Sequence, residues 1–538
     1  MSDTLVTLRT DVVIEPLVSR WYAWTHLVSP ATAALNTAFR HMALLESFIA
    51  APEIHVAAVQ DPAMRGGPFI DQPASAVPGI RQLLADTKEK QVLQLAFAKA
   101  LRDAGRLLIE RADGHSLQAL YAQLPEPVRG YLELVYTPGG GADIRLIEAL
   151  LYASPVYDAT AQSGLMHRVV GDHRPFALST PRLQRPDALE LRAPFAHTAY
   201  DLLARLRHQP QAEDEVISAV VDAFKLPPGD IDLFRSFLQP QASSRPAPAA
   251  PAHPPGKARW RYFGHACVHV ESPSGIHALL DPFVAYQSGD EPERLTLADL
   301  PVHIDYLVLT HNHQDHVLIE TLLALRHKTG TVLVPRSGGS LVDPSLKRAL
   351  QAIGFENVIE LDTLESAGHG DLRITALPFL GEHADLDIQT KAAWLVDAGQ
   401  HALLFAADSN NIEPRLYEKL RQRLPRLDAL FIGMECVGAP LSWLYGPLLP
   451  HPPERSKDQS RRLDGSDYPK ALQMVRTLGC DQVFIYAMGL EPWLSFISSI
   501  EPGDEESVAL RNANALILAC EELGIPAERL YGKAEAWL

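Results

Sequence analysis

The sequence predicts an α/β protein in two parts, a mixed α/β domain at residues 1–238 and a strand-rich α/β domain at residues 257–538. The first observation is the segment 239–256 (QPQASSRPAPAAPAHPPG), whose six prolines and five alanines cannot build a core and favour an extended linker. The second is that strand patterns alternate with helix patterns after residue 257, which is typical of sheets covered by helices. The length of 538 residues suggests two to four domains, each large enough to bury a core.

The N-terminal part has mixed patterns. Alternating Val, Leu and Ile predict one or two short strands within residues 2–15. Apolar residues three and four apart predict one or two amphipathic helices over 78–112. A strand is predicted at 131–137, followed by a Gly-rich turn and a helix from near Ile144, and another helix is predicted at 212–225. Nothing in this part is spaced as a metal or catalytic set.

The C-terminal part begins with a predicted β-hairpin, in which a Pro-Ser-Gly turn joins RWRYFGHACVHVES to IHALLDPF. A strand buried on both faces follows at residues 304–310 (IDYLVLT). Further strands are predicted at GTVLVP, DLRITALPF, AAWLVDAGQHALLFAAD, DALFIGME and QVFIYAM, with helices such as 313–327 and 506–523 between them. We therefore expect functional groups to gather where strands end.

Composition limits the cellular context. The 48 Lys and Arg residues against 65 Asp and Glu leave a formal charge of −17, which excludes a generally basic nucleic-acid binder. The four cysteines lie far apart without C-x-x-C spacing, which favours a reducing compartment over a disulfide framework or a thiolate zinc site. The N-terminus lacks the apolar region of a signal peptide, and no apolar run approaches the roughly 18 residues of a membrane span. We therefore expect a cytoplasmic protein without a membrane segment.

The main chemical signal is HNHQDH at residues 311–316, directly after the strand that ends at Thr310. The motif contains four potential metal ligands: His311, His313, Asp315 and His316. The first two can face one metal, while the last two reach a second about 3.5 Å away, the usual spacing of two-metal sites. A surface histidine cluster that binds metal adventitiously is the alternative.

This H-x-H-x-D-H motif after a strand resembles the metallo-β-lactamase superfamily, and GHAC (264–267) and LLDPF (279–283) fit the first hairpin of that superfamily. The resemblance implies that the C-terminal domain is a four-layered αββα sandwich with two metals at the sheet edge. It also implies three later ligands, namely a His on a loop, a bridging Asp at a strand end and a final His.

Of these three positions, the bridging one is matched plainly by Asp408 at the end of LLFAAD, for which capping of the next turn is the alternative role. The loop position has the sequence GEH, so that either Glu382 or His383 is the ligand. The final His is absent, because His451 in a Pro-rich loop is the only His after Asp408. Glu435, which leaves a buried strand, offers a substitute, since a buried carboxylate must be ligated or paired.

With Glu382 and Glu435 the set has three imidazoles and four carboxylates, which suits iron or manganese better than zinc. Together with residues 445–467 (YGPLLPHPPERSKDQSRRLDGSD), it resembles the diiron β-hydroxylases of nonribosomal peptide and antibiotic biosynthesis, a resemblance that extends over the whole chain. The resemblance implies two iron ions, O2 as co-substrate, an external electron donor or reductase, and β-hydroxylation of an aminoacyl thioester on a peptidyl carrier domain. It assigns His311, His313 and Glu382 to one iron, Asp315, His316 and Glu435 to the other, and Asp408 to the bridge.

Other residues are candidates for partner and substrate contacts. A basic segment in this acidic chain is a possible carrier-docking patch, with a solvated loop as the alternative, and contains Arg455, Lys457, Arg461 and Arg462. The aromatic residues Trp443, Tyr445 and Trp493 either line the substrate pocket or pack in the core. For the N-terminal part we expect a cap over the pocket, a homodimer interface, or both.

Two other functions stay open. A dinuclear zinc hydrolase of the same fold, of thioesterase or lactonase type, would use a metal-bound hydroxide, and His383 as a ligand would favour it. A scaffold that docks carrier domains without chemistry is the third. The intact ligand set argues against a scaffold, because buried charges are costly to retain without a metal.

Overall fold

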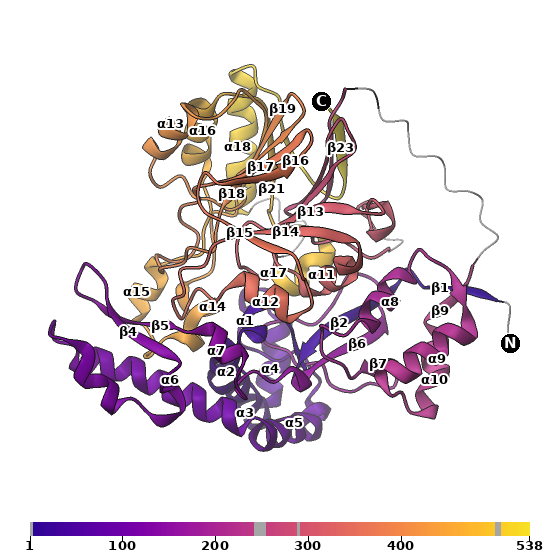
Figure 1. Cartoon of the computed structure of the whole chain (residues 1–538), viewed down its shortest axis with the longest axis vertical. Helices are drawn as coiled ribbons and strands as arrows, with labels where there is room; N and C mark the ends of the chain where they lie inside the picture. Colours follow the sequence, from indigo (N-terminus) through magenta and orange to yellow (C-terminus); the bar gives the residue numbers. More distant parts are fainter. Residues whose placement is uncertain (1–3, 242–253, 255, 288–290, 501–506) are drawn as a thin grey trace.

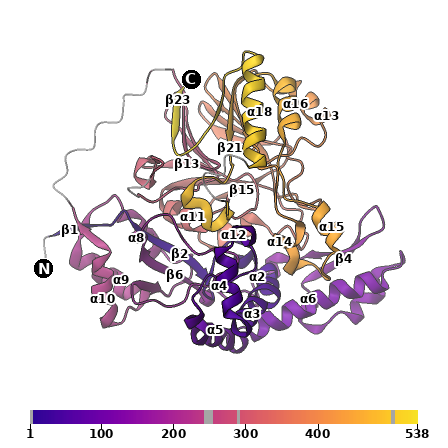
Figure 2. The same cartoon turned by 180° about the vertical axis from the view of Figure 1, so that it is seen from behind.

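The computed structural model describes residues 4–241, 254, 256–287, 291–500 and 507–538. The C-terminal part consists of two seven-stranded sheets with helices on their outer faces, and the N-terminal part lies along one side of this sandwich (Figure 1; Figure 2). The predicted α/β class and the four-layered arrangement are both confirmed.

The first sheet has the strand order β15-β14-β13-β12-β11-β10-β23. Its strands are β10 (Arg259–Gly264), β11 (Cys267–Glu271), β12 (His277–Leu280), β13 (Ile304–Val308), β14 (Thr329–Pro335), β15 (Val358–Leu361) and β23 (Ala534–Trp537). Strands β12 to β15 are parallel, so their carboxyl ends lie at one edge. Helices α11 (Ile319–Leu325) and α12 (Leu346–Ala352) pack against its outer face.

The second sheet has the strand order β16-β17-β18-β19-β20-β21-β22. Its strands are β16 (Ser366–His369), β17 (Leu372–Leu377), β18 (Ala393–Ala398), β19 (His401–Phe405), β20 (Leu427–Gly433), β21 (Cys480–Tyr486) and β22 (Ala527–Arg529). Its outer helices are α13 (Arg415–Arg421), α16 (Tyr468–Leu478) and α18 (Val508–Glu522).

Aromatic side chains fill the space between the two sheets. Trp260 from the first sheet meets Phe431 and Phe484 from the second with ring centroids 5.3 and 4.7 Å apart. Phe431 also stacks on Phe405 at 4.6 Å. Because both faces of the central strands are buried, these strands have the nearly continuous apolar sequences from which they were predicted.

The N-terminal part contains a four-stranded sheet β3-β2-β6-β7, a three-stranded sheet β8-β1-β9 and the hairpin β4-β5. The strands are β1 (Leu5–Leu8), β2 (Val12–Val18), β3 (Trp21–Tyr22), β4 (Leu132–Tyr136), β5 (Ala142–Leu146), β6 (Gln162–Arg168), β7 (Ala188–Leu191), β8 (Gln211–Ala212) and β9 (Leu238–Pro240). The helices are α1 (Thr25–Val28), α2 (Pro30–Asn36), α3 (Met42–Ala50), α4 (Pro52–Gln60), α5 (Val77–Lys90), α6 (Val92–Arg111), α7 (Glu148–Tyr152), α8 (Ala199–Arg205), α9 (Glu213–Phe224) and α10 (Ile231–Ser236). The strands predicted within residues 2–15 and the helices predicted at 78–112 and 212–225 are therefore present.

Three predicted elements differ from the structure. The helix expected from near Ile144 is strand β5, because Ile144 and Leu146 pair with β4 and bury their side chains. The predicted first hairpin is three strands, because the chain also reverses at His265, between β10 and β11. The helix expected at 313–327 begins only at Ile319, because the preceding residues form a turn in which His313 O accepts from Val317 N at 2.9 Å.

The two halves share one apolar core. It joins Phe48 and Phe97 of the N-terminal half to Leu441 and Tyr445 of α14 (Leu441–Tyr445). An ion pair also crosses between the halves: the buried Arg174, which pairs with Glu15 of its own half at 2.5 Å, contacts Glu320 of α11 at 2.6 Å. The N-terminal half is thus fixed close to the loop that precedes α11.

Most of the predicted linker, residues 242–253 and 255, lies outside the described residues, and Gln239 and Pro240 belong to β9. Among the described helices, none is by itself long and apolar enough to cross a membrane. The segments Pro30–Ala50 and Pro52–Gln60 pass that test only as a pair, bent by 106°.

Candidate metal centre

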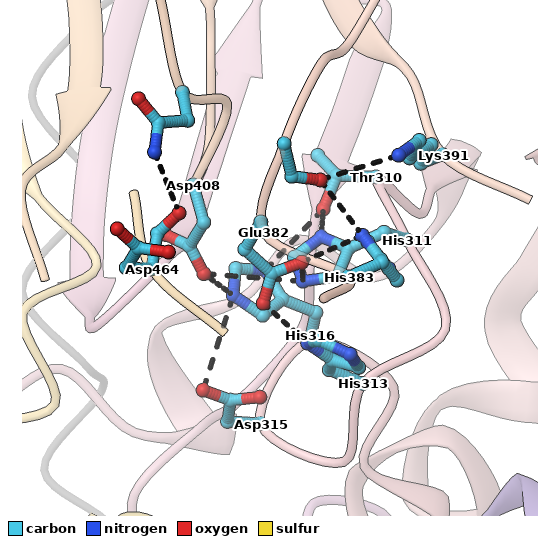
Figure 3. A network of polar contacts seen from close by, with 12 residues as sticks. Thr310, His311, His313, Asp315, His316, Glu382, His383, Lys391, Asp408 and Asp464 are labelled. Carbon is cyan, nitrogen blue, oxygen red and sulfur yellow. Dashed lines mark hydrogen bonds and ion pairs between the residues drawn. The ribbon is translucent and has the colours of Figure 1, made fainter. Parts of the chain in front are cut away.

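The HNHQDH segment forms the loop between β13 and α11 at the carboxyl edge of the first sheet (Figure 3). The start of this loop is fixed by Asp281, which follows β12. Its carboxylate accepts hydrogen bonds from Thr310 N at 2.7 Å and Thr310 Oγ1 at 2.6 Å. His311 and His316 are fully buried as a result.

His311, His313 and Glu382 form a first group whose ligand atoms all lie within 4.8 Å of one another. His313 Nδ1 is 2.6 Å from Glu382 Oε1, and His311 Nε2 is 3.6 Å from Glu382 Oε2. His383 belongs to none of the ligand groups among the described residues; it stacks on His313 at 4.5 Å, with Nδ1 3.0 Å from Glu382 Oε2. The geometry therefore favours Glu382 over His383 as the loop ligand.

A second group contains Asp315 and His316 together with His265, and a third contains His311, His316 and Asp408. Asp408 Oδ2 lies 2.9 Å from His316 Nε2 and 3.9 Å from His311 Nε2, so it faces both sides of the site. Figure 3 shows the Asp408 carboxylate beside Glu382 of the first group and His316 of the second. This is the place expected of a bridging carboxylate.

The donor set fits a pair of metal ions. Four of the buried polar atoms that have no hydrogen-bond partner among the described residues lie together at this place: His311 Nε2, Glu382 Oε2, His383 Nε2 and Asp408 Oδ1. Buried polar atoms are normally paired, so a cluster of unpaired lone pairs indicates a cation site. The backbone also makes room for the Asp408 carboxylate, because a Cβ at Gly433 would lie 2.4 Å from Asp408 Oδ1.

The pKa values of these side chains reflect this crowding. Burial and the neighbouring His316 and His313 keep the pKa of His311 well below its usual value. Burial alone would raise the pKa of Glu382, but His313 and His383 lower it to about 2. Burial also opposes the charge on His316, whose pKa is nevertheless raised by Asp408, Asp281 and Asp315.

Glu435 follows β20, as predicted, but its carboxylate is not part of the three groups found among the described residues. Oε1 instead accepts a hydrogen bond from Val437 N at 3.1 Å. Burial, with Asp408 and Asp464 nearby, raises the pKa of Glu435 to about 7. An excess of negative charge at this place is what a further cation would relieve.

The site opens into a cavity of about 740 Å³. The C-terminal half contributes His265, His313, Asp315, Glu382, Asp408 and Glu435 to its wall, together with Trp443, Leu444, Met488 and Ile497. The N-terminal half contributes residues 63–69. Met64 and Val437 line the cavity while being 49% and 48% exposed, so they mark where it meets the surface.

The other predicted residues fall in different places. Trp443 lines the cavity, Trp493 is buried in an apolar cluster, and the Tyr445 hydroxyl lies 2.9 Å from His313 Nε2. Arg455 and Lys457 are exposed on α15 (Arg455–Ser460). Arg461 Nε donates to Ala384 O at 2.7 Å and Arg462 Nε donates to Gly438 O at 2.8 Å. His451 is exposed and outside the ligand groups.

Sequence reasoning missed three residues of the site. Asp281, Tyr445 and His265 contact His316, His313 and Asp315 respectively. Two of them stood in the quoted segments LLDPF and GHAC, which pointed to the hairpin but not to these contacts. Tyr445 was considered only as a pocket or core residue.

Comparisons with known proteins agree with this geometry. Residues 7–241 match the family model for the diiron non-heme beta-hydroxylase N-terminal domain, and residues 277–440 match that for the beta-lactamase superfamily domain. The chain is 39% identical over 532 residues, 98% of each chain, to the 4-amino-L-phenylalanyl-[CmlP-peptidyl-carrier-protein] 3-hydroxylase of Streptomyces venezuelae. It matches the crystal structure of CmlA, a diiron beta-hydroxylase from Streptomyces venezuelae, with a TM-score of 0.92, 37% identity and 100% coverage of both chains.

Hydrolases are more distant. A metal-dependent hydrolase of Enterococcus faecalis is 25% identical over 158 residues, which cover 27% of this chain and 67% of the hydrolase. The similarity to the hydroxylase, in contrast, spans both halves and confirms the family predicted from the sequence. The chain belongs to the diiron non-heme β-hydroxylases.

Proposed function

We propose that this enzyme β-hydroxylates an aminoacyl group held as a thioester on a peptidyl carrier domain of a nonribosomal peptide synthetase. The observation that carries the proposal is the set of three overlapping ligand groups, most of whose members, Asp408 included, line one cavity. The hydroxylase relative, similar along 98% of the chain, acts by its name on such a carrier-bound amino acid.

His311, His313 and Glu382 would hold one iron, Asp315, His316 and Glu435 the other, and Asp408 would bridge them. When bound, the two irons supply the activation of O2 that hydroxylation of a C–H bond requires. The four carboxylates would offset the charge of the metal pair, which a histidine-rich set would not do. Glu435 would have to turn from Val437 N toward the metal to join this set.

The chain itself supplies a partly enclosed and partly apolar reaction space. Trp443, Met488 and Ile497 offer apolar surface for the acyl side chain, while residues 63–69 cover the cavity from the N-terminal half. Covering the cavity excludes water, which protects a reactive oxidant from side reactions. This supports the role of a cap for the N-terminal half.

The carrier domain would dock where the cavity meets the surface. Arg65 and Arg462 line the cavity there, beside the exposed Met64 and Val437. Basic residues at this place suit an acidic carrier, and the exposed Arg455 and Lys457 extend the basic surface along α15. An external reductase would supply electrons, and the four free cysteines fit a cytoplasmic location.

The direct test uses the iron-loaded chain, a carrier domain loaded with a panel of aromatic and aliphatic aminoacyl groups, a chemical reductant and O2. We expect one aminoacyl-carrier species to gain the mass of one oxygen atom, and no gain without iron or O2. Free amino acids under the same conditions are the control. Release of the acyl group as a free acid, without oxygen gain, would contradict this proposal and indicate a hydrolase instead.

A further inference from the structure

His265 is a buried histidine at the metal centre for which the resemblance provides no role. It lies in the reversal between β10 and β11, with a left-handed backbone (φ 51°). The reversal follows an irregular register between Tyr262 and Gly264. Gly264 is itself at φ +115°, and a Cβ there would lie 2.6 Å from Trp493 Cζ2. Strained residues and bulges of this kind are common beside active sites, where they direct a side chain.

The segment after β21 holds this reversal in place. Ala487 N donates to His265 O at 2.9 Å, and Glu491 Oε1 accepts from His265 N at 2.9 Å. The buried Glu491 also accepts from the Tyr262 hydroxyl. Both backbone polar groups of His265 are therefore satisfied, and the imidazole is directed into the cavity that contains the ligand groups.

The two ring nitrogens of His265 have different partners. Nδ1 accepts a hydrogen bond from Gly489 N at 3.3 Å, and Nε2 lies 3.3 Å from Asp315 Oδ2. A neutral imidazole carries one hydrogen. Because Nδ1 is the acceptor, that hydrogen is on Nε2, which then lacks the lone pair that a metal requires.

Four of the other proposed ligands contact a residue that is not itself a proposed ligand. His311 Nδ1 contacts Thr310 Oγ1 at 2.9 Å, His313 Nε2 contacts Tyr445, His316 Nδ1 contacts Asp281, and Glu382 Oε2 contacts His383. Among the described residues, the ion-pair partners of Asp315 are His265 at 3.3 Å and His316 at 4.0 Å. Since His316 is itself a proposed ligand, His265 is left as the partner of Asp315.

From this geometry we infer that His265 is a positioning residue, which donates its Nε2 hydrogen to Asp315 and holds that carboxylate toward the second metal. The inference rests on the ligand set proposed above. His265 could also be taken for a metal ligand, because its ligand atom lies within 4.8 Å of those of Asp315 and His316. Our inference assigns it a different role, as the partner of the ligand Asp315. Partners of this kind fix the orientation of a metal ligand, and their loss typically weakens metal binding 10- to 100-fold.

The test measures Co2+ binding to the metal-stripped full-length chain, by equilibrium dialysis and by the visible absorption of bound Co2+. Co2+ reports on the dinuclear site whether or not the enzyme hydroxylates a carrier-bound substrate, so failure of the proposed function is separable from failure of this inference. The variants are His265→Ala, His265→Gln, whose amide N–H can replace the Nε2 donor, and His277→Ala as a histidine control on β12 of the same sheet.

In His265→Ala we expect the first Co2+ to bind as in the unchanged chain and the second roughly 10- to 100-fold more weakly. In His265→Gln, the affinity for the second ion should recover to within a few-fold of that of the unchanged chain. The control His277→Ala should bind both ions as the unchanged chain does. Normal binding of both ions by His265→Ala would overturn the inference. So would equal loss in His265→Gln and His265→Ala, since a ligand is not replaced by an amide donor.

A double-mutant cycle separates an effect of His265 on Asp315 from a general effect of the substitution on folding. If His265 acts through Asp315, then His265→Ala adds no further loss in an Asp315→Ala background. Additive losses would show an independent or merely structural role. Thermal unfolding of the metal-free variants shows whether each is folded at the temperature of the binding measurement.

Discussion

The carboxylate of Asp281 lies 2.8 Å from His316 Nδ1, on the opposite side of the imidazole from Asp408, which is 2.9 Å from Nε2. One histidine is thus held between a carboxylate that orients it and a carboxylate that we propose as a ligand of the same metal. The same Asp281 accepts two hydrogen bonds from Thr310, so it connects the strand end, the loop and the ligand. Such carboxylate–histidine pairs fix the ring and raise its basicity as a ligand.

Asp281→Asn should therefore weaken binding of the metal held by His316, by roughly 10- to 100-fold. The change removes the negative charge behind Nδ1 while keeping the size of the side chain. Competition with a chelator measures the loss. Asp305→Asn is the matched control, because Asp305 lies on β13 of the same sheet and accepts from His277 N instead of a proposed ligand. Equal metal affinity in both variants would contradict the role of Asp281.

Tyr445→Phe should weaken binding of the metal ion at His313, by a smaller factor than Asp281→Asn weakens binding at His316. The buried hydroxyl lies 2.9 Å from His313 Nε2, and a neutral hydrogen bond contributes about 1 kcal/mol, which corresponds to roughly fivefold. The ring and its packing remain. The same chelator competition measures the effect, with Tyr152→Phe, at a hydroxyl that contacts Ser29, as the control. No difference between the two variants would show that Tyr445 only fills space.

Glu435→Ala tests the seventh proposed ligand. Its carboxylate lies in the cavity wall but outside the three ligand groups. If it turns to the metal, the variant should retain about one metal ion per chain, as measured by elemental analysis after gel filtration. Two tightly bound ions in Glu435→Ala would show that another group completes the second position.

Charge reversal tests the docking surface. Arg65→Glu and Arg462→Glu should each lower kcat/KM for a carrier-bound substrate by roughly tenfold at low salt, because they line the cavity opening. Added salt should reduce the difference, since it screens exposed charges. Arg455→Glu and Lys457→Glu, on α15, should have smaller effects. A larger effect of the Arg455 and Lys457 variants than of the Arg65 and Arg462 variants would show that the carrier docks on α15 instead.

Glu148 provides a pH-dependent contact between the two halves. Its carboxylate accepts from Ser345 N at 3.1 Å, and burial raises its pKa from 4.5 to about 7. The folded chain then keeps a proton that the unfolded chain loses, so this stabilisation is fully present below pH 4.5 and is lost as the pH rises through about 7. Its size is at most about 3 kcal/mol.

Glu148→Gln removes this titration. We expect the apparent unfolding temperature of the variant to fall less than that of the unchanged chain between about pH 5 and about pH 8. Differential scanning fluorimetry across that range measures the difference. Parallel curves for the two proteins would show that Glu148 titrates alike in the folded and unfolded chain.

Much of the site could be predicted because its signals are local. HNHQDH, the strand before it and Asp408 at the end of the apolar segment LLFAAD are short patterns whose meaning does not depend on distant residues. Glu382 and His383 are adjacent, so only three-dimensional geometry separates them: Glu382 contacts both His311 and His313, whereas His383 stacks behind.

The errors arise where distant residues decide the local structure. Strand β5 forms because β4 offers a partner, which outweighs the helical appearance of residues after Ile144. The reversal at His265 has no Asn-Gly signal and depends on Ala487, Gly489 and Glu491 from the far end of the chain. Tyr445 reaches His313 across 132 positions of sequence, a contact that no periodicity records.

The most direct test of the central claim is the identity and number of metal ions in the chain purified after growth with both iron and zinc available. The account predicts two irons per chain and the absorption of a coupled diferric site. Two zinc ions that are not exchanged under iron supplementation would contradict it and point to hydrolysis of a thioester or lactone.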